Sequence, residues 1–276
     1  MNNRAVRIME FLANNTKIEI NMLAELLDVS QVTLRRDLDK LEKSGIVKRY
    51  HGYASLDGAD ETSKRIAVFY SIKKRIAKEA AQLINDGETI MVESGSCCTL
   101  FAEELALNKK NVTIITNSLF IANYIHDFRN IKIILLGGYL LPDSQVLVGP
   151  IISRFAQNFC VDKLFIGTDG FIPDQGFMCS DYLRAETITQ LTACANKVFI
   201  LTEAAKFKRR GTYSLIQFDK LSGVVTDDGI LEEAEVVLNK NNVQLFKVSS
   251  VEEKLKCRQF PGLPPVIYKE KSDQES

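Results

Sequence analysis

Apolar residues recur with a helical period in neighbouring stretches near the N-terminus. Leu34, Leu38 and Leu41 lie at positions i, i+4 and i+7, which predicts one buried stripe along a helix. The preceding stretch, residues 20–27, is apolar on one face, and the short turn 28–30 separates the two. The pattern therefore predicts two amphipathic helices joined by a tight turn, as in a helix-turn-helix. An earlier helix is predicted from the apolar face formed by Ala5, Ile8, Met9 and Leu12.

The polar face of the leucine-striped helix carries residue types that read DNA in the major groove. Ser30 can cap the helix by accepting a hydrogen bond from a free backbone N–H of the first turn. Glutamine can pair with adenine, arginine with guanine, and valine or the threonine methyl group can touch a thymine methyl. The residues predicted to contact DNA from this helix are Ser30, Gln31, Val32, Thr33, Arg35, Arg36 and Lys43. The alternative is an ordinary helical hairpin with a solvated basic face.

The residues after this helix predict a short hairpin, or wing. Gly45 is expected to end the helix, and residues 46–53 then alternate apolar with polar or basic positions. Lys48, Arg49 and His51 would lie on DNA phosphates, which supply affinity but no sequence information. His51 taken alone is also compatible with an ordinary turn. Residues 30–53 hold six Lys or Arg against three Asp or Glu, a local net charge of +3.

The run VSQVTLRRDLDKLEKSGIVKRYHGYA, residues 29–54, resembles the N-terminal winged helix of DeoR-type bacterial transcriptional regulators. That family typically reads VS-x-x-T-[IL]-RRDL-x-x-LE-x-x-G-x-x-x-R-x-HGG-A. The matching residues are Val29, Ser30, Thr33, Leu34, Arg35, Arg36, Asp37, Leu38, Leu41, Glu42, Gly45, Arg49, His51, Gly52 and Ala54. Tyr53 departs from the pattern, because the second glycine of HGG usually stands there. The resemblance implies a DNA-binding transcriptional regulator.

Beyond residue 72, short apolar runs alternate with helical patterns. The predicted strands are 89–92, 112–115, 131–136, 164–166, 198–201, 223–225 and 243–246, and the predicted helices are 72–84, 99–107, 118–127, 151–159, 181–195 and 231–239. Such alternation predicts an α/β domain with a mainly parallel sheet covered by helices on both faces.

A chain of 276 residues suggests about two domains. We expect a winged helix-turn-helix at 1–56, a linker with a short strand at 57–71, an effector-sensing α/β domain at 72–250 and a partly disordered tail at 251–276.

Composition places the chain among soluble globular proteins, with 46% hydrophobic and 25% charged residues. No apolar run approaches the ~20 residues of a membrane span, and no signal peptide is recognisable, so a cytoplasmic protein is expected. Lys plus Arg equal Asp plus Glu, at 35 each, and the overall charge does not indicate DNA. Six cysteines show no C-x-x-C pair, so free thiols and no metal or other cofactor are expected.

Polar and glycine residues follow the predicted strands, where open α/β sheets bind ligands. The turn after the first strand, 93–99, opens a helix, and a helix N-terminus offers N–H donors to an anion such as phosphate. The candidate effector-binding residues at these strand ends are Glu93, Gly95, Ser96, Cys97, Cys98, Thr99, Thr116, Asn117, Ser118, Gly137, Gly138, Asp169 and Lys206. Together they predict a small, anionic, hydroxylated ligand such as a phosphorylated sugar, although turns use such residues for capping as well.

The DeoR resemblance extends over residues 3–249. The family's effector domain typically reads D-x-G-[ST]-[ST], T-N-S, GG, G-A-D-G and D-x-[ST]-K-F. The corresponding runs are ESGSC at 93–97, TNS at 116–118, GG at 137–138, GTDG at 167–170 and EAAKF at 203–207. The resemblance implies sugar-phosphate sensing in a fold similar to ribose-5-phosphate isomerase and glucosamine-6-phosphate deaminase. The departures are Glu93 for aspartate, Cys97 for a hydroxyl residue, and Glu203-Ala204-Ala205 for a run with aspartate and serine.

These observations favour a repressor of a sugar-metabolism operon that binds operator DNA as a homo-oligomer and responds to a phosphorylated sugar. The alternative is a sugar-phosphate isomerase or deaminase with a DNA-binding appendage. Its candidate general bases would be Glu93, Asp169 and Asp227, with His126 as the available histidine. For Cys97 and Cys98, a helix N-terminus would lower the thiol pKa; the alternative is that both are small buried hydrophobes.

Overall fold

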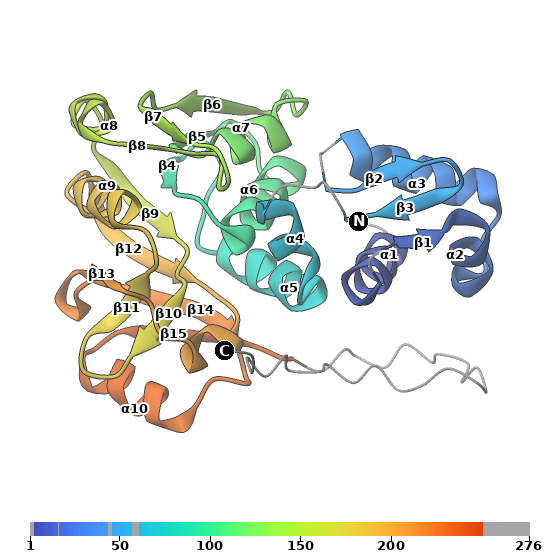
Figure 1. The fold of residues 1–276 in the computed structure, drawn as a ribbon. Coiled ribbons are helices and arrows are strands. Elements are labelled where there is room, and N and C mark those ends of the chain that lie inside the picture. Colours follow the sequence, from blue (N-terminus) through green and yellow to red (C-terminus); the bar gives the residue numbers. More distant parts are fainter. Residues whose placement is uncertain (1–2, 16, 44–45, 57–60, 251–276) are drawn as a thin grey trace.

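The computed structural model describes residues 3–15, 17–43, 46–56 and 61–250. The predicted helix end at Gly45, part of the predicted linker and the predicted tail at 251–276 lie outside these described residues. A small N-terminal domain and a larger α/β domain flank two connecting helices (Figure 1). No helix in the described part of the chain is both long and apolar enough to cross a membrane.

The N-terminal domain is a winged helix-turn-helix. Its elements are α1 (Asn3–Asn14), β1 (Lys17–Glu19), α2 (Ile20–Leu27), α3 (Gln31–Lys43), β2 (Lys48–Tyr50) and β3 (Tyr53–Ser55). The three strands form an antiparallel sheet in the order β1-β3-β2. The predicted leucine stripe of α3, Leu34, Leu38 and Leu41, is buried, as is the predicted apolar face of α1. The sequence prediction of this domain's fold is therefore confirmed.

The wing turns without the second glycine of the family pattern. Tyr50 pairs with Tyr53, so His51 and Gly52 alone form the turn. Gly52 has φ +77°, a left-handed conformation that glycine adopts at little cost. Tyr53 lies in extended β3 and stacks its ring under the Lys17 ammonium, 4.8 Å from the ring centroid.

Two helices connect the domains, α4 (Glu61–Ala67) and α5 (Tyr70–Ala81). The expected short strand in the linker is therefore wrong for the described residues. Helix α4 packs against α1 of the winged domain and α6 of the α/β domain, and Ile66 and Ala67 are buried. Packing contacts with distant segments stabilise this helix, which has no strong local apolar period.

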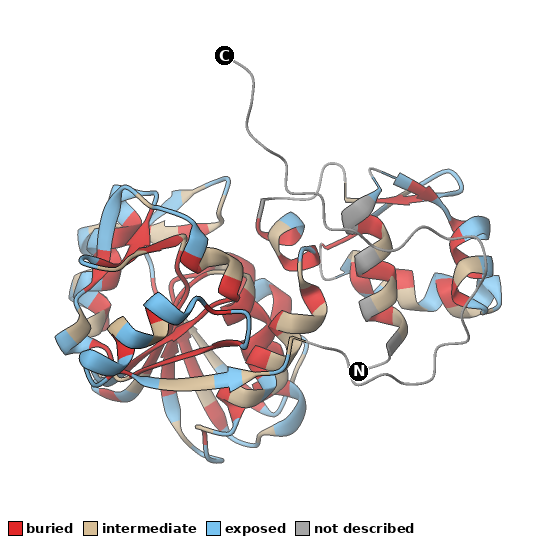
Figure 2. Cartoon of the chain, turned by 90° about the horizontal axis from the view of Figure 1, so that it is seen from below, coloured by how far each residue is buried: buried red, intermediate tan, exposed pale blue. Residues whose placement is uncertain are grey.

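The α/β domain is built on a seven-stranded sheet in the order β15-β14-β12-β9-β4-β5-β6, with every neighbouring pair parallel. The strands are β4 (Thr89–Val92), β5 (Val112–Thr116), β6 (Ile131–Leu135), β9 (Val161–Ile166), β12 (Ala195–Leu201), β14 (Gly223–Asp227) and β15 (Gln244–Val248). All seven correspond to predicted strands. The helices are α6 (Ser96–Asn108), α7 (Leu119–Ile125), α8 (Pro150–Ala156), α9 (Tyr182–Thr192) and α10 (Glu232–Lys240). Buried residues follow the strands and the inner faces of the helices (Figure 2).

The strand order reverses next to β4. The chain runs from β4 outward to β5 and β6, then crosses back to place β9 on the other side of β4. Met91 pairs with Leu164, and the Glu93 N–H donates to the Phe165 carbonyl oxygen at 2.8 Å. Such a switch point leaves a crevice at the carboxyl ends of the two strands, where ligands bind in open α/β sheets.

The α/β domain also contains smaller elements that the sequence patterns did not predict. They are the hairpin β7 (Tyr139–Leu141) and β8 (Val146–Val148), the sheet β10 (Gly170–Ile172), β11 (Gly176–Cys179) and β13 (Tyr213–Ile216), and the 3-10 helices η1 (Ala204–Lys208) and η2 (Phe218–Lys220).

Candidate functional site

Helix α3 presents its polar side chains to solvent. The Ser30 hydroxyl accepts a hydrogen bond from the Thr33 N–H at 3.2 Å, which is the predicted N-cap. Thr33 is half-buried and contacts Ser30 through its own hydroxyl. The exposed residues along the rest of this face are Gln31, Val32, Arg35, Arg36 and Lys43. The helix therefore exposes the hydrogen-bond donors and methyl groups that base edges require.

The wing presents fewer free cations than the sequence suggests. Lys48 and His51 are exposed, but Arg49 is half-buried and bonded to α3. Its guanidinium donates to the Glu42 carboxylate at 2.6 and 2.8 Å and pairs with Asp39 at 2.6 Å. Arg49 therefore fixes the wing to α3, and its contact with phosphate stays a prediction.

A cavity of about 320 Å³ lies at the switch point of the large sheet. This volume is at the lower end of the range for small-molecule pockets. Its walls come from the ends of β4, β9 and β12, the β7–β8 loop, the start of α9 and one residue of α4. The lining residues are Arg65, 94–97, 141–144, 167–169, Ser180, Asp181, Arg184, 201–203 and Lys206.

The turn between β4 and α6 forms the floor of this cavity. Gly95 precedes α6 with φ +117°, and no side chain caps the helix. A Cβ on Gly167 would lie only 3.0 Å from the Ser94 carbonyl oxygen, so the two turns approach closely because Gly167 has no side chain. Ser96 and Cys97 also line the cavity, so the first turn of α6 borders it, and the free N–H groups and dipole of a helix N-terminus favour an anion there.

Glu93 lies behind the cavity and holds the lining residue Arg184 in place. Its carboxylate is fully buried and accepts hydrogen bonds from Arg184 Nε at 2.8 Å and Nη2 at 3.0 Å. Arg184 Nη1 lies 3.3 Å from Asp169 Oδ2, and the Ser180 N–H donates to the same oxygen. Glu93, predicted to bind effector, therefore holds α9 and Asp169 in place and does not line the cavity.

Charges of both signs face the cavity. Burial acts to raise the pKa of Asp169, but nearby cations, Arg184 first among them, bring it below its ordinary value. Burial also acts to raise the pKa of Glu203, yet Lys73 and Lys206 lower it overall. Both carboxylates are therefore charged at neutral pH. For Lys206 burial lowers the pKa, an effect that a bound anion would offset.

Several predicted effector residues do not line the cavity. Thr99 donates to the Gly95 carbonyl oxygen, Thr116 and Ser118 satisfy backbone N–H groups, and Asn117 donates to the Leu147 carbonyl oxygen. Gly137 and Gly138 follow β6, at the far edge of the sheet from β9. A Cβ on Gly138 would lie 2.7 Å from the Val148 carbonyl oxygen, so close packing requires a glycine there. These residues cap and pack the turns, as the alternative interpretation held.

Both candidate thiols are buried. Cys97 lines the cavity, with Sγ 3.5 Å from Glu203 Oε2, whereas Cys98 donates to the Phe165 carbonyl oxygen behind it. Burial, followed by neighbouring carboxylates, raises the pKa of both thiols. The interpretation of both cysteines as small buried hydrophobes is therefore confirmed, and the lowering of the thiol pKa by the helix N-terminus is wrong, because desolvation outweighs the dipole.

Sequence reasoning missed Arg65 and Arg184, and it also missed the β7–β8 loop. Arg65 belongs to the predicted linker, and Arg184 to the predicted helix 181–195, for which no site residue was proposed. The β7–β8 loop contributes Asp143 and Ser144. The GTDG run at 167–170 and the EAAKF run at 203–207, by contrast, are both represented in the lining.

The residues considered for an isomerase or deaminase are not grouped as an acid and a base. Asp227 caps η1, accepting from the Ala204 N–H at 2.7 Å, and does not line the cavity. His126 is exposed at the end of α7, beside Asp127. Glu93 is bonded to Arg184, which leaves Asp169 as the one candidate base that lines the cavity.

The fold and these two surfaces define a DNA-binding protein with a separate ligand cavity. Residues 4–59 match the DeoR-like helix-turn-helix domain, and residues 69–228, more than half of the chain, match the DeoR C terminal sensor domain. The chain therefore belongs to the DeoR family of transcriptional regulators.

Curated relatives align with this chain over nearly their whole length. The chain is 32% identical over 231 residues to the HTH-type transcriptional regulator GolR of Listeria innocua, covering 82% of this chain and 91% of that protein. It is 27% identical to a putative aga operon transcriptional repressor of Escherichia coli O157:H7 (89% and 93%) and 28% identical to the repressor GlcR of Bacillus subtilis (88% and 95%). The relatives are named as regulators, which confirms the prediction of a regulator over that of an enzyme.

Solved structures resemble the chain weakly. A D-ribose-5-phosphate isomerase in complex with phospho-erythronic acid is 17% identical, with a TM-score of 0.38 over 50% of this chain and 54% of that one. A probable sor operon regulator from Shigella flexneri is 12% identical, with a TM-score of 0.39 over 61% and 88%.

Proposed function

We propose that this regulator represses a sugar-metabolism operon and that a phosphorylated sugar, bound in the cavity, releases it from operator DNA. The main support for this proposal is the position of the α6 N-terminus. The uncapped N-terminus of α6 faces a small cavity that also holds cations and carboxylates. Phosphate suits the helix N-terminus and Lys206, and sugar hydroxyls suit carboxylates such as Asp143 and Asp169.

The proposal assigns two roles to the winged domain. Arg35 and Arg36 read base edges in the major groove, and Lys48 and His51 contact phosphates. One recognition helix reads few base pairs, so the chain is proposed to act as a homo-oligomer on repeated half-sites, in the cytoplasm. The relatives include a putative aga operon transcriptional repressor, which supports a sugar-related operon.

A direct test begins by selecting operator DNA from a random-sequence library with the full-length protein. Operator binding is then titrated with ribose 5-phosphate, fructose 1-phosphate, fructose 6-phosphate, glucose 6-phosphate and glucosamine 6-phosphate, and with each unphosphorylated sugar as its matched control. At least one phosphate ester should weaken operator binding about 5–150-fold, the usual range of allosteric coupling. If neither binding nor release occurs with any sugar phosphate, the proposed effector class is wrong.

A further inference from the structure

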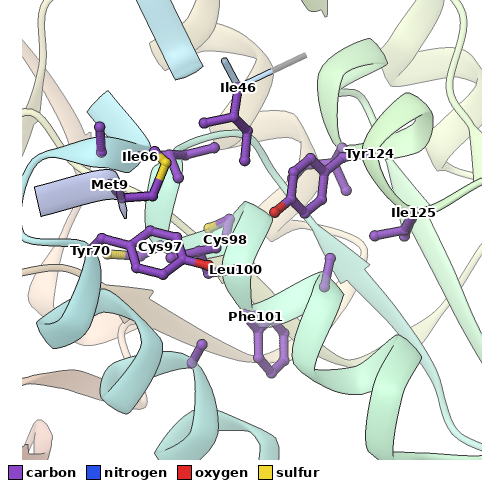
Figure 3. Packing of buried hydrophobic residues seen from close by; sticks show 14 of the residues in the cluster. Met9, Ile46, Ile66, Tyr70, Cys97, Cys98, Leu100, Phe101, Tyr124 and Ile125 are labelled. Carbon is purple, nitrogen blue, oxygen red and sulfur yellow. The ribbon is translucent and has the colours of Figure 1, made fainter. Parts of the chain in front are cut away.

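The connecting helix α4 packs on the winged domain. Helix α1 of the winged domain contacts both α4 and α5, on the side of that domain that faces the connecting helices (Figure 1). Met9 of α1, Ile66 of α4 and Tyr70 of α5 have no exposed surface and belong to one hydrophobic cluster that continues to Phe101 of the α/β domain (Figure 3). Protein interiors are close-packed, so a shift of α4 moves the surface on which α1 rests.

The same helix is a wall of the effector cavity. Arg65 lines the cavity from α4, and its charge is one of those acting on Asp169 across the cavity. Arg65 Nε is buried and, within the described part of the chain, has no hydrogen-bond partner. One turn earlier, the Thr62 hydroxyl donates to the carbonyl oxygen of Ser144, which also lines the cavity, at 3.4 Å. A buried guanidinium N–H without an acceptor is a position for a ligand oxygen.

A buried lysine connects the end of α4 to the opposite wall. Lys73 Nζ donates to the carbonyl oxygens of Arg65, at 2.5 Å, and Val68, at 2.7 Å. It also lies 3.8 Å from Glu203 Oε1 in the cavity wall. Phe69, with φ +56°, makes the sharp joint between α4 and α5. Helix α4 is therefore linked to two lining residues, to Ser144 through Thr62 and to Glu203 through Lys73.

From these contacts we infer that Arg65 binds the anionic group of the effector and that its movement carries α4, and with it α1, away from the DNA-bound arrangement. The inference rests on the proposed function and names the residue through which it is regulated. Lys206 and the N-terminus of α6 contact the same ligand from within the α/β domain, whereas the extensive contacts of α1 outside the winged domain are, among the described residues, with α4 and α5.

Arg65 and Lys206 should then contribute differently, Arg65 to the coupling between ligand and DNA and Lys206 to ligand affinity. A ligand shifts an equilibrium only through contacts that differ between the two states. Arg65 lies on the element that moves, so its contact differs between the DNA-bound and released states. The Lys206 contact is equal in both and supplies affinity alone. Removing Arg65 should therefore abolish coupling at saturating ligand, whereas removing Lys206 should only raise the ligand concentration required.

The experiment uses full-length protein, the selected operator and the sugar phosphate from the panel that releases the wild type most strongly. For each variant, ligand affinity is measured by calorimetry, and the ratio of operator Kd with and without saturating ligand is measured by fluorescence anisotropy. Arg65→Gln should weaken ligand binding about tenfold or more and reduce the ratio to below about twofold. Lys206→Gln should weaken ligand binding comparably but keep the wild-type ratio. Lys64→Gln, an exposed change on the same helix, is the control and should change neither quantity.

Arg65→Lys, which keeps the charge on α4, should restore a measurable part of the ratio. An Arg65→Gln protein that keeps the wild-type ratio at saturation would overturn the inference and leave the proposed function standing. A Lys206→Gln protein that loses the ratio as fully as Arg65→Gln would overturn it as well, because coupling would not then be specific to α4. Failure of every sugar phosphate to bind the wild type would overturn both proposals.

Discussion

Replacing Glu93 by glutamine should test whether this carboxylate positions the cavity or binds the ligand. The substitution keeps the shape of the side chain and removes its charge. In the wild type both carboxylate oxygens are bonded to Arg184, and neither side chain reaches solvent appreciably. Removing one partner of a buried ion pair costs about 3–5 kcal/mol, because the other charge stays desolvated.

The structure places the expected cost near the lower limit of that range. Asp169 lies 3.3 Å from Arg184 Nη1 and continues to neutralise part of the charge. We expect Glu93→Gln to lower the free energy of unfolding of the α/β domain by about 3 kcal/mol. For a domain of 150–250 residues, 1 kcal/mol changes Tm by about 2–4 °C, so Tm should fall by about 6–12 °C.

Urea and thermal unfolding followed by circular dichroism measure this cost. Glu186→Gln, at an exposed position two residues after Arg184 on α9, is the matched control and should change stability by less than about 0.5 kcal/mol. The double variant Glu93→Gln/Arg184→Met removes both charges of the pair and should recover part of the lost stability, but not all of it, because Asp169 loses its Arg184 contact and keeps only the Ser180 N–H donor on that side. A Glu93→Gln protein within 1 kcal/mol of wild type, but with weakened effector binding, would refute the positioning role and restore Glu93 as a ligand contact.

Three further outcomes are expected. Arg36→Ala should cost about 1–3 kcal/mol on the selected operator but little on unrelated DNA, whereas Lys48→Ala should weaken both alike and lower the salt slope by about 0.9. Equal loss on both DNAs for Arg36→Ala would contradict base reading. Gly95→Asp strains a positive-φ position and adds a negative charge next to the proposed phosphate site, so effector should no longer release this variant from operator DNA in titrations. Release of the variant at the wild-type effector concentration would show that the turn at Gly95 does not bind the phosphate. Iodoacetamide at pH 7.5 should label buried Cys98 at least about 100-fold more slowly than exposed Cys160 by peptide mass spectrometry, since burial raises the thiol pKa; comparable rates would contradict that burial.

The main sheet could be predicted because its strands are buried on both faces. Runs such as 164–166 and 198–201 are continuously apolar, the usual composition of parallel strands covered by helices. The sheet β10-β11-β13 could not, because its strands are short and β13 pairs with β11 from more than 30 residues away. The hydrophobic pattern along the chain does not indicate which distant strands pair.

Strand order decided which strand ends form the cavity. Several polar strand ends were recognisable in the sequence, but those after β5 and β6 lie on the side of β4 away from β9. The Thr116-Asn117-Ser118 turn therefore caps α7, while the turns after β4 and β9 line the cavity. Arg184 was hidden for a related reason: it is buried by Glu93, 91 positions away, and not by its neighbours along α9.

The cavity draws on residues as far apart as Arg65 and Lys206, whereas the winged domain closes its sheet with Ser55. At about 5–20 residues per second, the intervening ~150 residues take about 8–30 s to synthesise. Each new copy therefore acquires the surface that reads DNA well before the cavity that senses effector exists. We predict that a freshly made chain is insensitive to its effector while still on the ribosome. A nascent chain arrested after residue 150 should bind operator equally well with and without effector.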